Sequence, residues 1–361
     1  MTGPRRRLYL GMRAPPAEPN RWLCRFAWLT AGATLFLICS GGMVTSKNVG
    51  LAVPDWPTTF GYNMFFFPIS KWIGGIFFEH VHRLIASLVG FLTIILMIWL
   101  WRGEDRRWVR MLGYIALGAV VLQGVLGGLR VTLLKDEVGI FHACLAQAYF
   151  GILIVIALVT SPFWRRLSLG AAGSTTARRL ASIAIVTSSM IYLQLALGAT
   201  MRHEHRDLSI LDFPTAYGKI IPDTSAEKIA SINAWREARA LSEVNAFQIW
   251  LQMAHRFLAV AIGALLIAFW FSVQARAAHI AALSRLASWW LFVIACQIAL
   301  GAWTIWSNKA ADVATAHVAV GATIFGMGVA LSAICLQLTQ PKNSPGPAIQ
   351  PTFVKEGAHA L

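Results

Sequence analysis

Four histidines fall into two pairs that repeat along the sequence. His82 and His142 in the first half correspond to His255 and His317 in the second, since 255 − 82 = 173 and 317 − 142 = 175. A lone helical histidine is more often a packed core or interface residue, but each of these four opens an apolar segment, where an unpartnered imidazole is costly. Two imidazoles on facing helices can fill both axial positions of a haem iron. The pattern therefore indicates two haem sites.

The repeat distinguishes the candidate ligands from their neighbours. His80 lies two residues before His82, but the sequence shared by the two copies is His82-Arg83 and His255-Arg256, so His80 has no counterpart. Arg83 and Arg256 are predicted to be the only cations within the spanning segments, and a haem propionate is the partner we expect for each. Snorkelling of these side chains to the outer headgroups is the alternative.

Histidines and cysteines without a repeat partner are expected to have no ligand role. We expect the four remaining histidines to be solvated: His203, His205, His279 and His359. The five cysteines show no CxxC spacing and are expected to pack as small apolar residues: Cys24, Cys39, Cys144, Cys296 and Cys335.

Glu79 breaks the symmetry between the halves. It lies three residues before His82 and so shares its helical face, whereas Gln252 occupies the equivalent place before His255. A carboxylate can accept a proton or stabilise developing positive charge. Glu79 is therefore the predicted catalytic residue, with a structural ion pair to Arg83 at i+4 as the alternative.

The composition indicates an all-α integral membrane protein. Of 361 residues, 57% are hydrophobic and 13% charged, and the mean hydropathy is +0.60, beyond the range of ordinary soluble domains. Apolar runs long enough to cross a bilayer predict eight spanning helices, near 23–45, 81–101, 111–129, 140–161, 180–200, 247–273, 286–306 and 315–338.

The basic residues predict the orientation of the chain. Arginines gather in the termini and in the loops at 102–110, 165–179 and 274–285, which the positive-inside rule places in the cytoplasm with both chain ends. The net charge of +15 therefore reflects orientation and lipid contact and is no evidence for nucleic-acid binding. The first 22 residues lack an apolar core and are expected to be a tail, with a short mitochondrial presequence left open.

The repeat extends beyond the histidines. Gln123 and Gly127 match Gln297 and Gly301 at a separation of 174, while the loops 55–61 and 212–218 match at 157. One insertion of about 16 residues in the second outer loop accounts for the change of offset. The halves therefore predict two tandem, pseudo-symmetric four-helix bundles, related as parallel repeats by an axis along the membrane normal.

The predicted domain organisation follows from this repeat. A tail at 1–22 precedes the first bundle at 23–161, and an inner linker at 162–179 leads to the second bundle at 180–338, followed by a tail at 339–361. The outer loop 201–246 is expected to form short amphipathic helices on the surface. The outer loop 46–75 is rich in aromatic residues, typical of a rim over an apolar macrocycle or of interfacial anchoring.

These features together resemble the haem A synthase family of bacterial and mitochondrial membranes. The resemblance covers about residues 25–338 and includes the Glu-x-x-His-Arg run at 79–83, the Gln-x-x-x-Gly segments, the later histidines and the Asp-aromatic-Pro-Thr loops. It implies oxidation of the C8 methyl of haem O to the formyl group of haem A, in two successive oxidations through a hydroxymethyl group and an aldehyde hydrate. The loop 46–75 lacks the cysteine pair that some members carry there.

The resemblance also implies roles for residues and partners. His82 and His142 would hold the substrate haem O with Glu79 as the catalytic carboxylate, while His255 and His317 would hold a permanent haem B that passes electrons. It implies haem O synthase and oxidase assembly factors as partners, together with an unidentified electron donor or acceptor and membrane lipid. The expected location is a bacterial plasma membrane, in preference to the mitochondrial inner membrane.

Two other functions were weighed against the synthase. A dihaem b-type cytochrome, such as a quinol oxidoreductase, would hold two permanent haems, and the Glu79 and Gln252 difference favours the enzyme over it. A transporter would be expected to place broken helices and polar residues near the midplane, whereas the polar residues here concentrate at the outer end of the helices.

Overall fold

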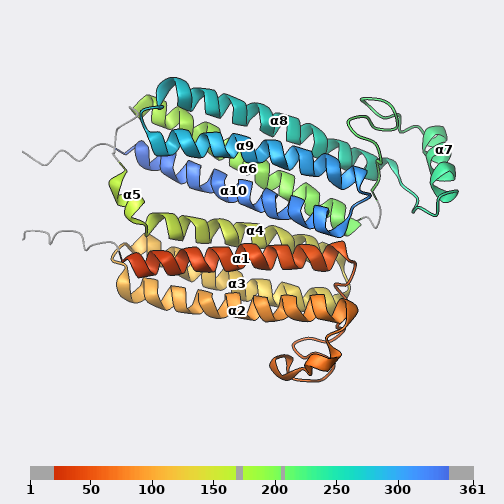
Figure 1. Cartoon of the computed structure of the whole chain (residues 1–361), viewed down its shortest axis with the longest axis horizontal. Coiled ribbons are helices and arrows are strands. Elements are labelled where there is room, and N and C mark those ends of the chain that lie inside the picture. The colour runs from red at the N-terminus through yellow and green to blue at the C-terminus, as the bar shows by residue number, and fades with distance from the viewer. Residues whose placement is uncertain (1–19, 168–173, 205–207, 341–361) are drawn as a thin grey trace, which may run out of the picture.

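The computed structural model describes residues 20–167, 174–204 and 208–340, and the long elements in these ranges are helices (Figure 1). Eight of them are long and apolar enough to cross a membrane, which confirms the predicted fold class. They are α1 (Arg21–Ser46), α2 (Gly74–Gly103), α3 (Arg107–Leu133), α4 (Asp136–Val159), α6 (Ser174–Glu204), α8 (Ala246–Arg276), α9 (Ala281–Trp306) and α10 (Ala311–Leu338). The short helices are η1 (Met64–Phe66), η2 (Ile69–Lys71), α5 (Pro162–Arg166) and α7 (Ala226–Glu237).

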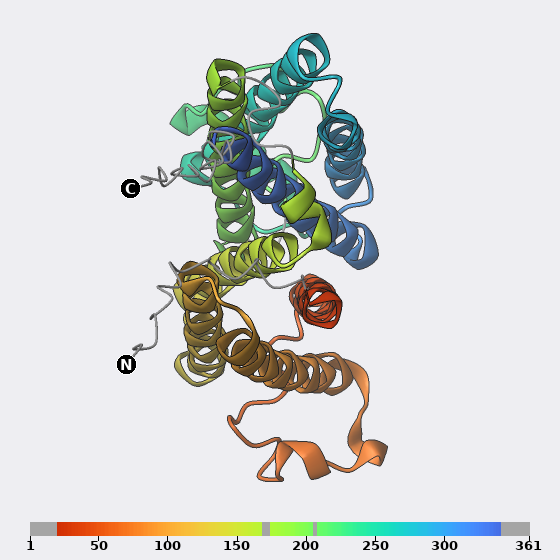
Figure 2. The same cartoon turned by 90° about the vertical axis from the view of Figure 1, so that its left-hand side faces the viewer.

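The long helices pack in two groups of four. Each of α1 to α4 contacts two others of its own group, and α6, α8, α9 and α10 do the same among themselves. The groups meet where α1 and α4 contact α10, and α4 contacts α6, as the end-on view shows (Figure 2). The more buried helices are therefore α4 and α10, which have partners in both groups. The domain boundaries and the pseudo-symmetry of the two groups stay predictions.

Reciprocal contacts join α4 to α10. A Cβ placed at Gly326 of α10 would lie 2.9 Å from the Phe150 ring of α4, and one at Gly151 of α4 would lie 3.1 Å from the Phe325 ring of α10. Each helix thus inserts an aromatic ring where the other has no side chain. Small residues of this kind let membrane helices approach closely, so the two groups pack tightly along this line.

The helices run further than the apolar runs that predicted them. The helix expected at 81–101 begins at Gly74, and the one expected at 111–129 continues to Leu133. The short amphipathic helix expected in the second outer loop is α7. The predicted tails at 1–22 and 339–361 fall almost wholly outside the described residues, as do residues 168–173 of the linker.

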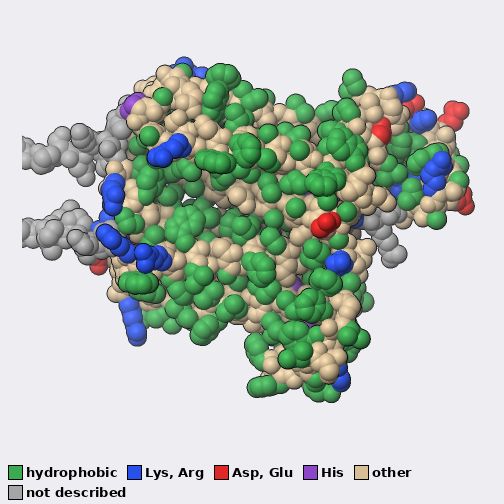
Figure 3. All heavy atoms as spheres, viewed as in Figure 1, with side chains coloured by type: hydrophobic (Ala, Val, Ile, Leu, Met, Phe, Trp, Pro, Cys, Tyr) green, Lys and Arg blue, Asp and Glu red, His purple; other side chains and the backbone are tan. Residues whose placement is uncertain are grey.

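One end of the molecule is basic. Lysine and arginine side chains gather at the end of the molecule where α1 begins and α10 ends, while apolar side chains cover the flanks of the helices (Figure 3). At this end Arg106 forms an ion pair of 2.8 Å with Glu104 and donates to the carbonyl of Val159 at 3.0 Å. Burial opposes ionisation of Glu104, but its hydrogen bonds with Arg106 outweigh this and lower the pKa of the carboxyl group. The basic end is the face predicted to be cytoplasmic.

Candidate functional site

The four repeated histidines lie near the outer ends of their helices. His142 and His317 are each six residues after the first residue of α4 and α10, whereas His82 is eight after Gly74 and His255 is nine after Ala246. At 1.5 Å per residue these positions are about 9 to 14 Å along the helix. The second of the paired histidines in each half is therefore the shallower one.

Each of the four imidazoles rests on a glycine of the preceding long helix. A Cβ placed at Gly41 in α1 would lie 3.0 Å from Cε1 of His82, and one at Gly301 in α9 would lie 3.1 Å from Cε1 of His317. A Cβ placed at Gly127 in α3 would lie 3.4 Å from Cε1 of His142, and one at Gly198 in α6 would lie 3.5 Å from Cε1 of His255. All four rings are therefore held against a neighbouring helix within the protein. An added Cβ would crowd the ring at Gly41 and Gly301 and would make ordinary contact with it at Gly127 and Gly198.

The charge of each histidine acts on the other member of its expected pair. His82 is influenced by His142, and His255 by His317. The members of each pair lie on the second and fourth long helices of one group, and their ligation of one iron stays a prediction. Such a pair can present two uncharged nitrogen donors to one iron.

Glutamines of the preceding helices fix the backbone at three of the histidines. Gln123 donates to the carbonyl of His142 at 3.1 Å, and its repeat equivalent Gln297 donates to the carbonyl of His317 at 2.9 Å. Gln194 donates to the carbonyl of His255 at 2.9 Å. The repeat had indicated Gln123 and Gln297 but gave them no contact, and it gave no sign of Gln194.

His82 differs from the other three in its ring contacts. Its Nδ1 lies 3.3 Å from the hydroxyl of Ser40, whereas Nδ1 of His142, His255 and His317 is buried without a hydrogen-bond partner. Nearly all buried polar groups are paired. A histidine that binds a metal normally donates its other ring N–H to a partner, so the orphaned Nδ1 atoms do not themselves mark the ligands. Two neutral imidazoles in each apolar helix group are the donor set of a six-coordinate haem iron, and on that ground the residues present fit the group that the sequence indicated.

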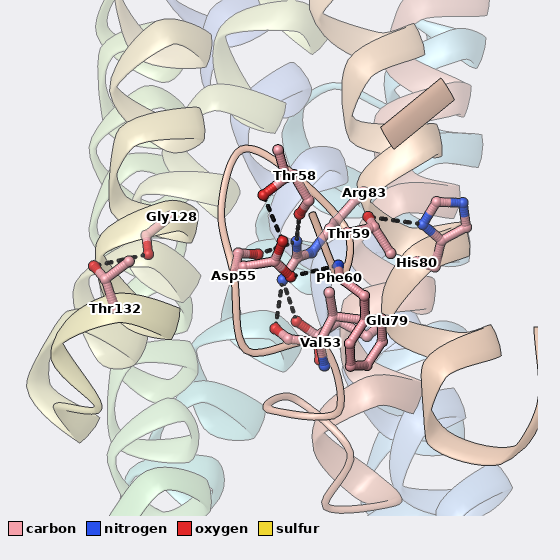
Figure 4. A network of polar contacts seen from close by, with 10 residues as sticks. All are labelled: Val53, Asp55, Thr58, Thr59, Phe60, Glu79, His80, Arg83, Gly128 and Thr132. Carbon is pink, nitrogen blue, oxygen red and sulfur yellow. Dashed lines mark hydrogen bonds and ion pairs between the residues drawn. The ribbon is translucent and has the colours of Figure 1, made fainter. Parts of the chain in front are cut away.

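Arg83 is bound to the first outer loop. Its guanidinium donates to the carbonyls of Asp55 at 2.7 Å, Thr58 at 3.0 Å and Val53 at 2.9 Å, and pairs with Glu79 at 2.7 Å (Figure 4). These contacts hold the loop against the start of α2. The ion pair that was the alternative interpretation of Glu79 is thus present.

Arg256 repeats this arrangement in the second half. It donates to the carbonyls of Thr215 at 2.8 Å and Asp212 at 2.7 Å, the residues equivalent to Thr58 and Asp55. Both arginines therefore have loop carbonyls as their partners. Propionate binding by Arg83 and Arg256 stays a prediction, and it would require these arginines to release or share the loop.

Glu79 and Gln252 have equivalent contacts. The Glu79 carboxylate accepts from the backbone N–H of Val53 at 3.0 Å, and the Gln252 amide oxygen accepts from the N–H of Ile210 at 2.9 Å while its NH2 donates to the Ile210 carbonyl at 3.0 Å. Both side chains are almost completely buried. Each therefore anchors its outer loop, and they differ in charge and in the second contact, since Glu79 pairs with Arg83 whereas Gln252 donates to the Ile210 carbonyl.

The two outer loops are folded around an aspartate. The Asp55 carboxylate accepts from the N–H groups of Phe60 at 2.7 Å and Gly61 at 2.9 Å, and from the hydroxyl of Thr58; Asp212 makes the same three contacts one repeat later. Burial opposes ionisation of Asp55, but the hydrogen bonds outweigh it and lower the pKa. The Asp-aromatic-Pro-Thr sequence is therefore a loop-forming motif.

His80 belongs to the first loop rather than to the histidine pairs. Its buried ring faces the hydroxyl of Thr59 at 3.3 Å (Figure 4). The ring also packs against Phe67 and Trp72, at ring-centroid distances of 5.1 and 4.7 Å. Other apolar side chains of the loop project outward, with exposed fractions of 65% for Phe65 and 80% for Phe66. The aromatic residues thus divide between a loop core and an exposed apolar face.

Two helical arginines lie beyond those predicted. Arg130 lies in the last turn of α3, and Arg202 lies in the last turn of α6. Arg202 donates across the group boundary to the Gly42 carbonyl at 2.9 Å and the Ser46 hydroxyl at 2.5 Å, both in α1. The prediction that Arg83 and Arg256 are the only cations in the spanning helices is therefore wrong, because these helices extend past the apolar runs and because Arg25 lies inside the run predicted at 23–45.

His203 also differs from its predicted state. It is half-buried in α6, where a Cβ placed at Gly139 of α4 would lie 2.5 Å from its Cε1. It interacts electrostatically with Arg130, Arg202 and His142. The expectation that it is solvated was wrong, whereas His205 and His359 lie outside the described residues.

Comparison with known proteins places this geometry in a family. Residues 70–329 match the family described as cytochrome oxidase assembly protein. The chain belongs to this family. The match contains all four paired histidines, both loop-bound arginines and Glu79.

Relatives named Heme A synthase extend over most of the chain. The protein of that name from Geobacillus kaustophilus is 23% identical over 343 residues, covering 90% of this chain and 94% of the relative. The one from Rhodopseudomonas palustris is 27% identical over 337 residues, covering 84% and 87%. The one from Lysinibacillus sphaericus is 26% identical over 264 residues, covering 71% and 77%. The resemblance to this family is thereby confirmed.

Proposed function

We propose that the chain is a haem A synthase, which oxidises the C8 methyl group of haem O to a formyl group. The supporting observation is that two histidine pairs, each ring resting on a glycine, occur in a chain whose relatives carry that name. His82 and His142 would hold the substrate haem O. His255 and His317 would hold haem B, which supplies one-electron transfer when it is bound.

The substrate would pass through two oxidations at one carbon. Each oxidation replaces one C–H bond by C–OH and formally removes two electrons, which an external oxidant must accept. The methyl group would first become hydroxymethyl and then an aldehyde hydrate, which loses water to leave the formyl group. Glu79 is the proposed catalytic carboxylate of this pocket. Both its oxygens are engaged, one by Val53 and the other by Arg83, so a proton transfer through Glu79 requires one of these contacts to open.

Replacing Glu79 separates its possible roles. Glu79→Gln keeps an oxygen that can accept from Val53, as Gln252 does for Ile210, and removes only the charge. We expect normal haem content and product formation reduced about 10²- to 10⁴-fold, the range for losing a general acid or base, measured by mass spectrometry of extracted porphyrins. Glu79→Ala, which also loosens the loop, is the comparison. Normal product from Glu79→Gln would reduce Glu79 to loop anchoring.

A dihaem b-type cytochrome is the second candidate. The observation that favours it is the equivalent loop-anchoring role of Glu79 and Gln252, which weakens the argument that their difference implies chemistry. Production of the protein with a haem O supply distinguishes the two functions. Hydroxymethyl or formyl porphyrin supports the synthase, whereas two unmodified haems B in a spectroscopically intact protein support the cytochrome.

The proposal extends to location and partners. The basic end of the molecule supports cytoplasmic termini in a bacterial plasma membrane, with the haem sites near the outer face. Haem O synthase would supply the substrate, and oxidase assembly factors would receive the product. The electron donor or acceptor is a further partner that this chemistry requires.

A further inference from the structure

Arg130 is a half-buried cation held close to the backbone of the first outer loop. A Cβ placed at Gly50 would lie 2.8 Å from its Nη1 and 3.0 Å from its Nη2. The guanidinium therefore fits against this segment only because residue 50 has no side chain.

The guanidinium of Arg130 lacks the partners that the other outer arginines have. Arg83 makes four contacts with the first loop and Glu79, and Arg202 makes two with α1. Across residues 20–167, 174–204 and 208–340, no side chain or carbonyl accepts a hydrogen bond from Arg130, and no carboxylate lies within ion-pair distance of it. A partly desolvated guanidinium with five unsatisfied donors calls for an anionic partner.

The position of Arg130 places it at the first histidine pair. It lies three residues after Gly127, the α3 glycine on which the His142 ring rests, and its charge acts on His82 and His142 and on the carboxylates of Glu79 and Asp136. An anion bound by Arg130 would therefore lie beside a porphyrin held by these two histidines.

The cation is specific to this pocket. The residue equivalent to Arg130 in the second half is Thr304, since 130 + 174 = 304, and its hydroxyl donates within α9 to the Leu300 carbonyl at 2.8 Å. The cation near His317 is instead Arg202, whose guanidinium is bonded to α1. Arg202 and Arg256 each leave Nε without a partner, but both are bonded through their terminal nitrogens, whereas Arg130 makes no hydrogen bond with the described residues.

We propose that Arg130 binds a propionate carboxylate of the porphyrin substrate in the first pocket and so orients it. This inference rests on the proposed function. A planar guanidinium matches a carboxylate in two parallel hydrogen bonds, and one such contact fixes the rotation of a porphyrin about the axis through its two histidines. Arg130 is a positioning residue in this proposal, since the methyl group to be oxidised is elsewhere on the ring.

The test compares two probes on the purified full chain. Iron protoporphyrin IX has free carboxylates, and its dimethyl ester does not; both are titrated and followed by the low-spin absorption of the bound haem. The variants are Arg130→Thr, which installs the residue of the second half, and Arg130→Lys. Arg110→Thr, in the same helix at the basic end, is the matched control. In His255→Ala the second pocket should no longer bind haem, so the binding step that remains in the titration belongs to the first pocket.

For the wild type we expect the first pocket to bind the free acid at least about 10-fold more tightly than the ester, the size of one hydrogen bond to a charged group. Arg130→Thr should bind both probes equally, Arg130→Lys should keep part of the difference, and Arg110→Thr should keep all of it. A variant that merely folds less well binds both probes more weakly by the same factor, so the ratio of the two affinities does not change. An unchanged acid-to-ester ratio in Arg130→Thr would overturn the proposal, as would equal losses for both probes.

This outcome is separable from that of the proposed function. Porphyrin extracted from the same preparations is analysed for hydroxymethyl and formyl groups. Absence of both in the wild type would contradict the synthase function while the acid-to-ester ratio still reported on Arg130. Oxidised product with no ratio effect would contradict only the role of Arg130.

Discussion

Replacing Gly41 by alanine tests whether the glycines make room for the imidazoles. The added Cβ would lie 3.0 Å from Cε1 of His82, whereas carbon atoms prefer about 3.5 to 4.0 Å. The ring must therefore retreat by at least about 0.5 Å. Overpacking of this kind costs about 1 to 3 kcal/mol, so haem in the first pocket should bind about five- to 150-fold more weakly, at 1.4 kcal/mol per factor of ten.

Gly32→Ala is the matched control for this prediction. Gly32 lies in the same helix and has nothing within 4 Å of a built Cβ, so it should give only the general gain of about 1 kcal/mol from replacing a helical glycine. That gain affects the protein with and without haem alike and appears in thermal unfolding, not in haem affinity. Haem retention and the low-spin spectrum are the readouts. Equal behaviour of Gly41→Ala and Gly32→Ala would refute the steric argument.

Three further predictions concern the pairs and the loop. His255→Ala or His317→Ala should abolish the low-spin haem signal of the second pocket, and an unaltered spectrum would reject that ligand assignment. His80→Ala should cost far less haem binding than His82→Ala, because its ring lies in the loop core; the reverse order would contradict the repeat alignment. The pKa of Asp55 lies below the ordinary 3.8 because its carboxylate accepts hydrogen bonds in the folded loop. The ionised carboxylate should therefore hold the loop fully above about pH 3.8, and protonation should release the loop as the pH falls through the lowered pKa of Asp55. Limited proteolysis should thus be constant from pH 7 to 4 in the wild type and increase below, while Asp55→Asn should be cut faster at neutral pH with less dependence on acid.

The sequence could predict the helices because hydrocarbon imposes length and apolarity on each span. It could also show which histidines are repeat equivalents, since duplication preserved their spacing, while their pairing as haem ligands stays a prediction. The ends of the helices were harder, because a helix continues into the interface after its apolar run stops. Arg130 and Arg202 were missed for that reason: they follow directly on runs taken to end at 129 and 200.

Contacts between helices could not be read from the spacing alone. The match of Gly127 with Gly301 was visible, but that each faces an imidazole depends on how neighbouring helices are rotated. In the same way, the sequence showed that Glu79 stands where Gln252 stands, while only the fold shows that both bind a loop N–H. The sequence shows which residues are equivalent in the two halves, whereas the contacts of those residues depend on how the helices pack.

The contacts of Arg202 with α1 make the halves of the chain interdependent. A severed carboxyl-terminal fragment would deprive this guanidinium of the Gly42 carbonyl and the Ser46 hydroxyl, and each lost hydrogen bond to a charged group costs about 1.5 to 3 kcal/mol. Fragments cut between α5 and α6 and produced together should consequently recombine into a haem-binding complex. Fusion to unrelated partners should fail to rescue either one.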